Sequence, residues 1–279
     1  MTLTAKLGRS AQVAAVDAWR SQGDAALQRH PDELAMEEPL EIRVAGEPLA
    51  VTMRTPGHDH ELVAGFLLAE GVIQSRADLG AIRHCARLGG EGAHNTIDAL
   101  PAPGVVLEVE ATRRGTLTTS ACGMCGRKLI DDLFERLRPT AAAARFSRSF
   151  IAGLSSELRK QQPSFERTGG LHAAGIAFAD VGLRVVREDV GRHNAVDKVI
   201  GRLVLDGLLP AAGGVLVVSG RTSFEIVQKA LGAGLSAVVG VSAPSSLAAS
   251  TAARFGLLLC GFARGEAFNV YAGAERLLE

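Results

Sequence analysis

The sequence predicts a protein of the α/β class, because segments with the apolar pattern of strands alternate with segments that have helical spacing. The alternation begins near residue 183 and continues to about residue 262. The strand-like segments are apolar throughout, which is typical of a parallel sheet covered on both faces. The predicted strands are residues 183–186, 214–219, 237–241 and 257–262, and the predicted helices are residues 194–205, 224–231 and 245–254.

Composition narrows the functional class. The chain has 279 residues, of which 47% are hydrophobic and 22% charged, so it can bury a substantial core. Its 30 Lys and Arg residues balance its 30 Asp and Glu residues, which gives no reason to expect a nucleic-acid partner. No apolar run is long enough to span a membrane. Four cysteines are too few for a disulfide scaffold, so we expect a cytoplasmic protein.

The chain before residue 183 predicts a smaller α+β part. In residues 41–44 and 49–53, apolar and polar side chains alternate on either side of Gly46, as in a hairpin. The apolar residues of 62–70 have helical spacing. Residues 81–87 and 104–110 are predicted strands, and residues 140–163 are expected to connect two halves. We predict a flexible extension at 1–38 with a short helix around 11–20, an N-terminal α+β part at 39–145, and a C-terminal α/β domain at 146–279 with the cofactor-binding loops.

Cys122 and Cys125 form a C-x-x-C pair on a Gly-rich segment. This spacing supports disulfide exchange, half of a metal site, or a thiol nucleophile with a helper. Residues 127–138 have helical spacing and end at Pro139. The pair therefore precedes a predicted helix N-terminus, where the helix dipole favours the thiolate. The sequence predicts a reactive sulfur in this loop.

A metal site is not expected elsewhere. The run from His58 to Glu61 contains four possible ligands, but adjacent residues at a helix start point in different directions. We therefore favour a turn and helix cap, with Asp59 as the capping residue, over metal binding. Cys85 and Cys260 lie singly in apolar segments and are expected to be inert.

The loops that follow the predicted strands are equipped to bind an anion. Arg192, Arg221 and Arg264 occupy three of these loops, and Gly, Ser and Thr residues occur beside predicted helix N-termini. Strand ends in open α/β sheets are the usual ligand site, and arginine pairs well with phosphate. Neither a G-x-G-x-x-G nor a Walker motif is present. The loops predict a phosphorylated ligand.

Taken together, these segments resemble the FdhD family of sulfur carrier proteins, or sulfurtransferases, that formate dehydrogenase requires. The resemblance covers about residues 55–271 and depends on several motifs in order. These are Thr55-Pro56, Ala64-Gly65-Phe66, Glu70-Gly71, Thr118–Gly126 with its Cys-Gly-Met-Cys-Gly run, Thr168–Ala174, Arg187–Lys198, Ser219–Lys229, Ser242–Leu247 and Gly261-Phe262.

The resemblance implies a concrete reaction. The family accepts sulfur from a cysteine desulfurase as a persulfide and transfers it to the molybdenum (or tungsten) bis-guanine-dinucleotide cofactor of formate dehydrogenase. The persulfide position corresponds to Cys122, and Cys125 matches the second cysteine. The family fold resembles a three-layer cytidine deaminase, members are typically homodimers, and GDP is expected to mimic the cofactor. The implied cofactor-binding residues are Phe262, Ala263, Arg264, Gly265, Glu266 and Ala267, although this stretch matches the family only loosely and Ala121 replaces a common serine.

Other functions fit less well. A zinc deaminase needs a glutamate two residues after its histidine ligand, whereas Ala174 follows His172 at that position. A structural zinc or iron–sulfur site needs four ligands, but the only cysteines outside the pair are Cys85 and Cys260, each alone in an apolar segment. A thioredoxin-like enzyme would place its C-x-x-C directly after an early strand, commonly beside a tryptophan, but the only tryptophan is Trp19, far from the pair. A non-catalytic chaperone that binds the cofactor without moving sulfur remains the main alternative, and would leave the cysteines replaceable.

Overall fold

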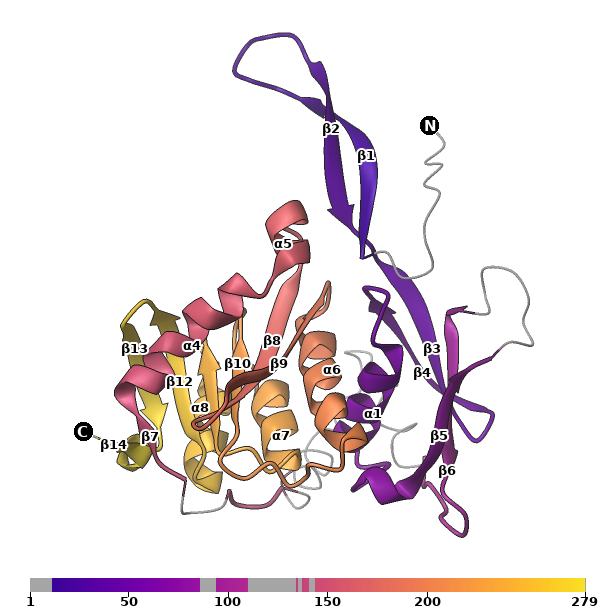
Figure 1. Cartoon of the computed structure of the whole chain (residues 1–279), viewed down its shortest axis with the longest axis vertical. Coiled ribbons are helices and arrows are strands. Elements are labelled where there is room, and N and C mark those ends of the chain that lie inside the picture. The colour runs from indigo at the N-terminus through magenta and orange to yellow at the C-terminus, as the bar shows by residue number, and fades with distance from the viewer. Residues whose placement is uncertain (1–11, 86–93, 110–133, 135–136, 141–143, 279) are drawn as a thin grey trace, which may run out of the picture.

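A computed structural model describes residues 12–85, 94–109, 134, 137–140 and 144–278. Its N-terminal element is a hairpin of β1 (Val13–Arg20) and β2 (Gln28–Ala35), which projects from the body of the molecule (Figure 1). The helix expected around residues 11–20 is therefore wrong. Its alanines favour a helix locally, but antiparallel pairing from Val13 with Ala35 to Arg20 with Gln28 outweighs that preference.

A four-stranded sheet follows, in the order β4-β3-β6-β5. The predicted hairpin is confirmed as β3 (Glu38–Val44) and β4 (Glu47–Arg54). Ala45 and Gly46 between them both have positive φ, as in the turns that suit a two-residue hairpin. The other strands are β5 (Leu79–His84) and β6 (Thr96–Pro101). The 3-10 helix η1 (Arg76–Asp78) leads into β5.

The strand predicted at residues 104–110 is wrong over its described part. Residues 104–109 have no strand pairing, and Gly104 is in a turn with a φ of 80°. Leu107 and Val109 instead pack as partly buried side chains against the main core. The alternation of buried and exposed side chains in this segment thus reflects packing of one side against the core rather than pairing in a sheet.

The C-terminal sheet has six strands in the order β13-β12-β11-β10-β8-β9. Strands β10 to β12 are parallel, as predicted, but β8 and β13 run antiparallel to their neighbours, so the sheet is mixed. Tight turns at Gly182 and Gly265, both with positive φ, return the chain directly and explain the antiparallel pairs β8–β9 and β12–β13. The strands are β8 (His172–Phe178), β9 (Gly182–Asp189), β10 (Val215–Val218), β11 (Ala237–Gly240), β12 (Leu258–Arg264) and β13 (Ala267–Ala272).

Helices cover both faces of this sheet (Figure 1). On one face lie α6 (Arg192–Leu205), α7 (Phe224–Gly232) and α8 (Ser246–Phe255). The other face is covered by α4 (Arg148–Lys160). The segment expected as a connection, residues 140–163, therefore contains a helix. Ser147 caps its N-terminus, and Ile151, Leu154 and Leu158 form its buried stripe.

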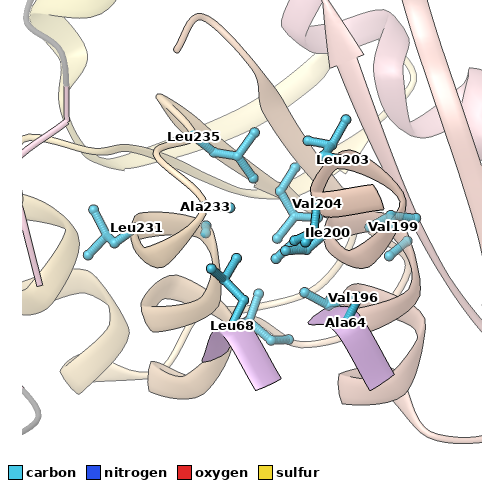
Figure 2. Packing of buried hydrophobic residues seen from close by; sticks show 14 of the residues in the cluster. Ala64, Leu68, Val196, Val199, Ile200, Leu203, Val204, Leu231, Ala233 and Leu235 are labelled. Carbon is cyan, nitrogen blue, oxygen red and sulfur yellow. The ribbon is translucent and has the colours of Figure 1, made fainter. Parts of the chain in front are cut away.

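The two parts of the chain share one core. Helix α1 (Asp59–Ala69) packs against α6, with Ala64 and Leu68 close to Val196 and Ile200 (Figure 2). The same buried cluster continues into the four-stranded sheet. The α/β class is confirmed, whereas the division at residue 145 and the likeness to deaminases remain predictions. The remaining elements are β7 (Phe146–Ser147) paired with β14 (Leu277–Leu278), α5 (Pro163–Thr168) and the 3-10 helix η4 (Ala274–Arg276).

Candidate functional site

A cavity of about 730 Å³ lies at the edge of the C-terminal sheet where β10, β11 and β12 end and β8 begins. This volume falls in the range of small-molecule sites. The ends of α4 and α5 close the cavity on the other side. Its lining includes the basic side chains Arg159, Lys160, His172 and Arg264 beside the apolar Leu158, Phe165, Leu171 and Ala263. The cavity therefore combines apolar walls with positive charge.

Hydrogen bonds between the post-strand loops hold this edge together. The Ala173 N–H donates to Ser219 Oγ at 2.9 Å, and the Ser219 N–H donates to the Ala173 carbonyl at 3.0 Å. The Thr222 N–H donates to Ala243, and the Ser245 N–H donates back to Thr222. These bonds join the loop after β10 to the loop after β11, where each strand leads into its helix. The loops thus form a fixed rim rather than separate turns.

The six residues expected to bind cofactor form the end of β12, the turn and the start of β13. Ala263, Arg264 and Gly265 line the cavity. Phe262 has a φ of 53° at an irregularity between β12 and β13, and it is 44% exposed. Glu266 and Ala267 are also exposed. The bulge therefore directs part of this stretch into the cavity and part of it towards solvent.

The three arginines predicted from the loops occupy the same edge. Arg264 lines the cavity. Burial lowers the pKa of His172, and the charges of Arg192 and Arg221 lower it further. A Cβ on Gly220 would lie 3.3 Å from Nδ1 of His172 and 4.0 Å from Cδ of Arg192. These positions place a neutral imidazole among several cations, an arrangement that suits an anionic ligand.

Sequence reasoning missed Arg159, Lys160, Gln162 and Phe165 as lining residues. They come from α4, α5 and the junction between them, within or just after the segment expected to be a connection. The apolar spacing of Ile151, Leu154 and Leu158 was the available signal for a helix.

Cys122 and Cys125 lie outside the described residues, as does most of the helix predicted at 127–138. Phe134, which the structure does describe, has helical backbone. Its ring centroid lies 5.7 Å from that of Phe224 at the start of α7 and 6.3 Å from that of Phe255 at the end of α8. Phe134 comes nine positions after Cys125, so the chain between them can span at most roughly 30 Å.

The run from His58 to Glu61 forms ion pairs. Arg54 Nε donates to Asp59 at 3.1 Å, and Arg187 Nε donates to Glu61 at 2.6 Å. His58, with a φ of 59°, is the residue that caps α1, and its side chain makes no capping hydrogen bond. The prediction that Asp59 caps the helix is therefore wrong. Within the part of the chain that the structure describes, no group of three or more potential ligands is arranged to hold a metal.

The motif from Arg187 to Lys198 fixes the start of α6, which carries Arg192. The Lys198 ammonium lies 2.7 Å from Asp189, and both side chains are fully buried. Asp189 also accepts from the Gly191 N–H at 2.8 Å, and Asn194 Nδ2 donates to both Asp189 and the Met53 carbonyl. The motif residues that form these bonds thus hold the start of α6 against β4.

Cys260 has the burial expected of an inert thiol, whereas the inertness expected of Cys85 stays a prediction. Cys260 is buried in β12, and burial raises its pKa to about 12. Cys85 is partly buried at the end of β5. The Cys260 thiol therefore stays protonated at neutral pH and is a poor nucleophile.

Comparison with known proteins shows the family to which the chain belongs. The sequence model of the FdhD/NarQ family matches residues 35–278. The chain belongs to this family. A Streptomyces coelicolor protein named sulfur carrier protein FdhD is 49% identical over 259 residues, which cover 91% of this chain and 92% of the relative. One with the same name from Anaeromyxobacter dehalogenans is 51% identical over 255 residues, which cover 88% of each chain.

The family fold is also found in a solved structure. A crystal structure from Desulfotalea psychrophila, described as that of a candidate formate dehydrogenase accessory protein, aligns with a TM-score of 0.76. The alignment covers 96% of this chain and all of that one, at 24% sequence identity. This likeness supports the fold alone. The hairpin of β1 and most of β2 precedes the part that the family model matches. In the part of the chain that the structure describes, no helix is long and apolar enough to cross a bilayer.

Proposed function

We propose that the chain is a sulfur carrier that serves formate dehydrogenase. Cys122 accepts sulfur from a cysteine desulfurase as a persulfide and passes it to the molybdenum bis-guanine-dinucleotide cofactor bound at the cavity. Membership of a family whose relatives are named sulfur carrier proteins supports this function. The observation that carries the cofactor part is the cavity that Arg159, Lys160, Arg264 and His172 line at the sheet edge.

The acceptor chemistry matches the cavity. A guanine dinucleotide carries pyrophosphate groups, which pair with arginine and lysine, and flat bases, which pack against apolar and aromatic walls. Charge and apolar surface occur together here. A neutral His172 among cations adds an imidazole that phosphate can hydrogen-bond.

The sulfur chemistry fits the cysteine pair. The Cys122 thiolate attacks the outer sulfur of the desulfurase persulfide, the sulfur–sulfur bond of the donor breaks, and the donor cysteine leaves as a thiolate. Cys125 is the adjacent thiol that can shield or resolve the new persulfide. Phe134, packed at Phe224, holds the chain beyond the pair beside the start of α7. A homodimer, with cysteine desulfurase and formate dehydrogenase as partners, is part of the proposal.

The alternative is a non-catalytic assembly chaperone that binds the cofactor and moves no sulfur. The cavity is compatible with it, because the charged and apolar lining fits a bound cofactor with or without sulfur transfer. Under this alternative, Cys122→Ala would still activate formate dehydrogenase.

Titration calorimetry with GDP separates the two parts of the proposal. Arg264→Ala should weaken GDP binding about tenfold or more, because a charge-assisted contact is lost. Cys122→Ala should bind GDP as the wild type does. If Arg264→Ala bound GDP normally, the assignment of the cavity to phosphate would be wrong.

A further inference from the structure

Strand β13 forms one outer edge of the six-stranded sheet (Figure 1). Its sequence, from Ala267 to Ala272, contains no charged residue and no proline. Within the described part of the chain, the backbone of β13 forms hydrogen bonds only with β12. The N–H and C=O groups on the other side of β13 are therefore open to a further strand.

The other edges of the two larger sheets, β9, β4 and β5, are protected. Strand β9 carries Arg187 and Glu188, whose side chains bond to α1 and to the start of α5. Strand β4 contains Pro48, and strand β5 contains Arg83. Charged residues and proline are the usual means by which proteins prevent unwanted strand addition. The lack of both in β13 indicates an edge that is kept open.

Exposed apolar side chains lie beside this edge. Tyr271 of β13, Phe262 of β12 and Leu247 in the first turn of α8 are 40%, 44% and 45% exposed. A Cβ on Gly261 would lie 3.0 Å from Cε2 of Tyr271 and 2.9 Å from Cδ of Pro244, so these two side chains lie on the same face of the sheet. A segment paired with β13 would cover this apolar surface as well as the open backbone groups.

The edge begins beside the cavity. Arg264 and Gly265 line the cavity, and β13 starts two residues after Gly265. A sulfurated cofactor held in the cavity has to pass to the protein that will use it. That acceptor protein must therefore approach the cavity, which brings it to the start of β13.

We propose that β13 docks the acceptor protein, apo-formate dehydrogenase, by pairing with an extended segment of that protein. The segment carries uncharged residues, because β13 offers no charged partner, and apolar side chains at alternate positions contact Tyr271 and Phe262. The segment adds an outer strand to the six-stranded sheet and holds the acceptor beside the cavity. This inference rests on the proposed function for the identity of the partner.

A second copy of the chain could also pair with this edge. Two copies of β13 related by a two-fold axis would pair in antiparallel fashion, which places their cavities at opposite ends of the joined strands. Such pairing would close the edge to the acceptor in both copies. The position of β13 beside the cavity favours the acceptor protein.

The test measures binding of purified formate dehydrogenase, produced without cofactor, to the immobilised full-length chain by biolayer interferometry. Asn269→Lys places a charge at an exposed position near the middle of β13, so the dissociation constant should rise about tenfold or more. Tyr271→Ser removes an apolar contact and should also weaken binding. Val51→Lys is the matched control, because Val51 is exposed on the edge strand β4, and this variant should bind as the wild type does.

Hydrogen exchange measures the main-chain pairing directly. The outward amides of β13 should exchange about tenfold or more slowly when apo-formate dehydrogenase is bound, whereas the amides of β5 should be unaffected. Equal binding by the wild type and both β13 variants, without protection of β13, would overturn this inference. Protection of β13 in a free wild type that has the mass of two chains would also overturn it, since a second copy would then occupy the edge.

Sulfur loading separates this inference from the proposed function. A wild type that gains sulfur from a cysteine desulfurase but does not bind apo-formate dehydrogenase would overturn the docking edge and leave the sulfur carrier standing. A wild type that gains no sulfur would overturn the proposed function, whereas binding through β13 would still support the docking edge.

Discussion

Gly201 of α6 lies directly against Gly65 of α1. A Cβ on Gly201 would lie 2.7 Å from the Gly65 amide nitrogen and would overlap the Glu61 carbonyl oxygen. A Cβ on Gly65 would overlap the Asp197 carbonyl oxygen. The two helices therefore touch through their backbones, and this contact joins the N-terminal part of the chain to the helix layer of the C-terminal sheet.

Gly201→Ala should destabilise the protein by about 3 kcal/mol or more, because the methyl group meets backbone that cannot rotate away. Urea denaturation measures this change. Gly153→Ala is the matched control, since Gly153 also lies within a helix but a methyl group there would have nothing within 4 Å. That variant should be neutral or more stable by about 0.5–1 kcal/mol. Equal losses from both variants would contradict the close contact.

Lys198→Met should destabilise the protein by roughly 3–5 kcal/mol, because it leaves the fully buried Asp189 without its cation. Arg29→Ala serves as the comparison. Arg29 pairs with Asp17 at 2.9 Å, but both side chains are largely exposed and the pair should contribute less than about 1 kcal/mol. Denaturation of the two variants side by side tests whether the motif from Arg187 to Lys198 stabilises the fold.

Asp197→Asn should remove part of the pH dependence of stability. Burial raises the pKa of Asp197 to about 6, and Lys229, which lies 2.6 Å away, only partly offsets the effect. Because the folded state binds this proton more tightly than the unfolded state does, the contribution of Asp197 to stability falls as pH rises from about 4 to about 6.

Urea denaturation across this pH range should therefore show the wild type losing stability relative to Asp197→Asn as pH rises. Asp180→Asn is the control at an exposed position and should follow the wild type. A constant difference between the wild type and Asp197→Asn across the range would contradict the raised pKa.

His172 should gain a proton when a phosphorylated ligand binds. Burial, Arg192 and Arg221 lower its pKa in the free protein, and an adjacent phosphate would raise it. GDP affinity should therefore increase as pH falls from about 8 to about 6. His172→Gln should flatten this increase. Calorimetry in buffers of different ionisation enthalpy measures the proton uptake directly, and identical uptake by both proteins would exclude His172 as its source.

The sequence predicted the C-terminal elements well because their strands are apolar and bounded by turn residues. Residues 214–219 and 237–241, for example, correspond to β10 and β11. It could not predict that β8 and β13 are antiparallel, since strand direction depends on tight turns at Gly182 and Gly265. The sequence favours a helix over strand β1 (Val13–Arg20) because this segment is rich in alanine, whereas the strand depends on pairing with β2, which local composition does not indicate.

For the candidate site, the sequence indicated the wall formed by the end of β12 but not the wall formed by α4 and α5. The expectation for Arg264 depended on the order of strands and loops, and the structure places this residue in the wall of a cavity. Gln162 and Phe165 have no local pattern that indicates a ligand. Their position depends on the Glu188 carboxylate, a contact between residues more than twenty positions apart that only the folded chain forms.

Intact-protein mass spectrometry after incubation with a cysteine desulfurase and free cysteine shows directly whether the chain carries sulfur. The wild type should gain the mass of one sulfur atom, and a reductant should remove it. Cys122→Ala should gain none, whereas Cys260→Ala should load normally, because the Cys260 thiol is buried and its pKa is raised. The absence of any gain in the wild type, with a competent desulfurase present, would contradict sulfur transfer and favour the chaperone.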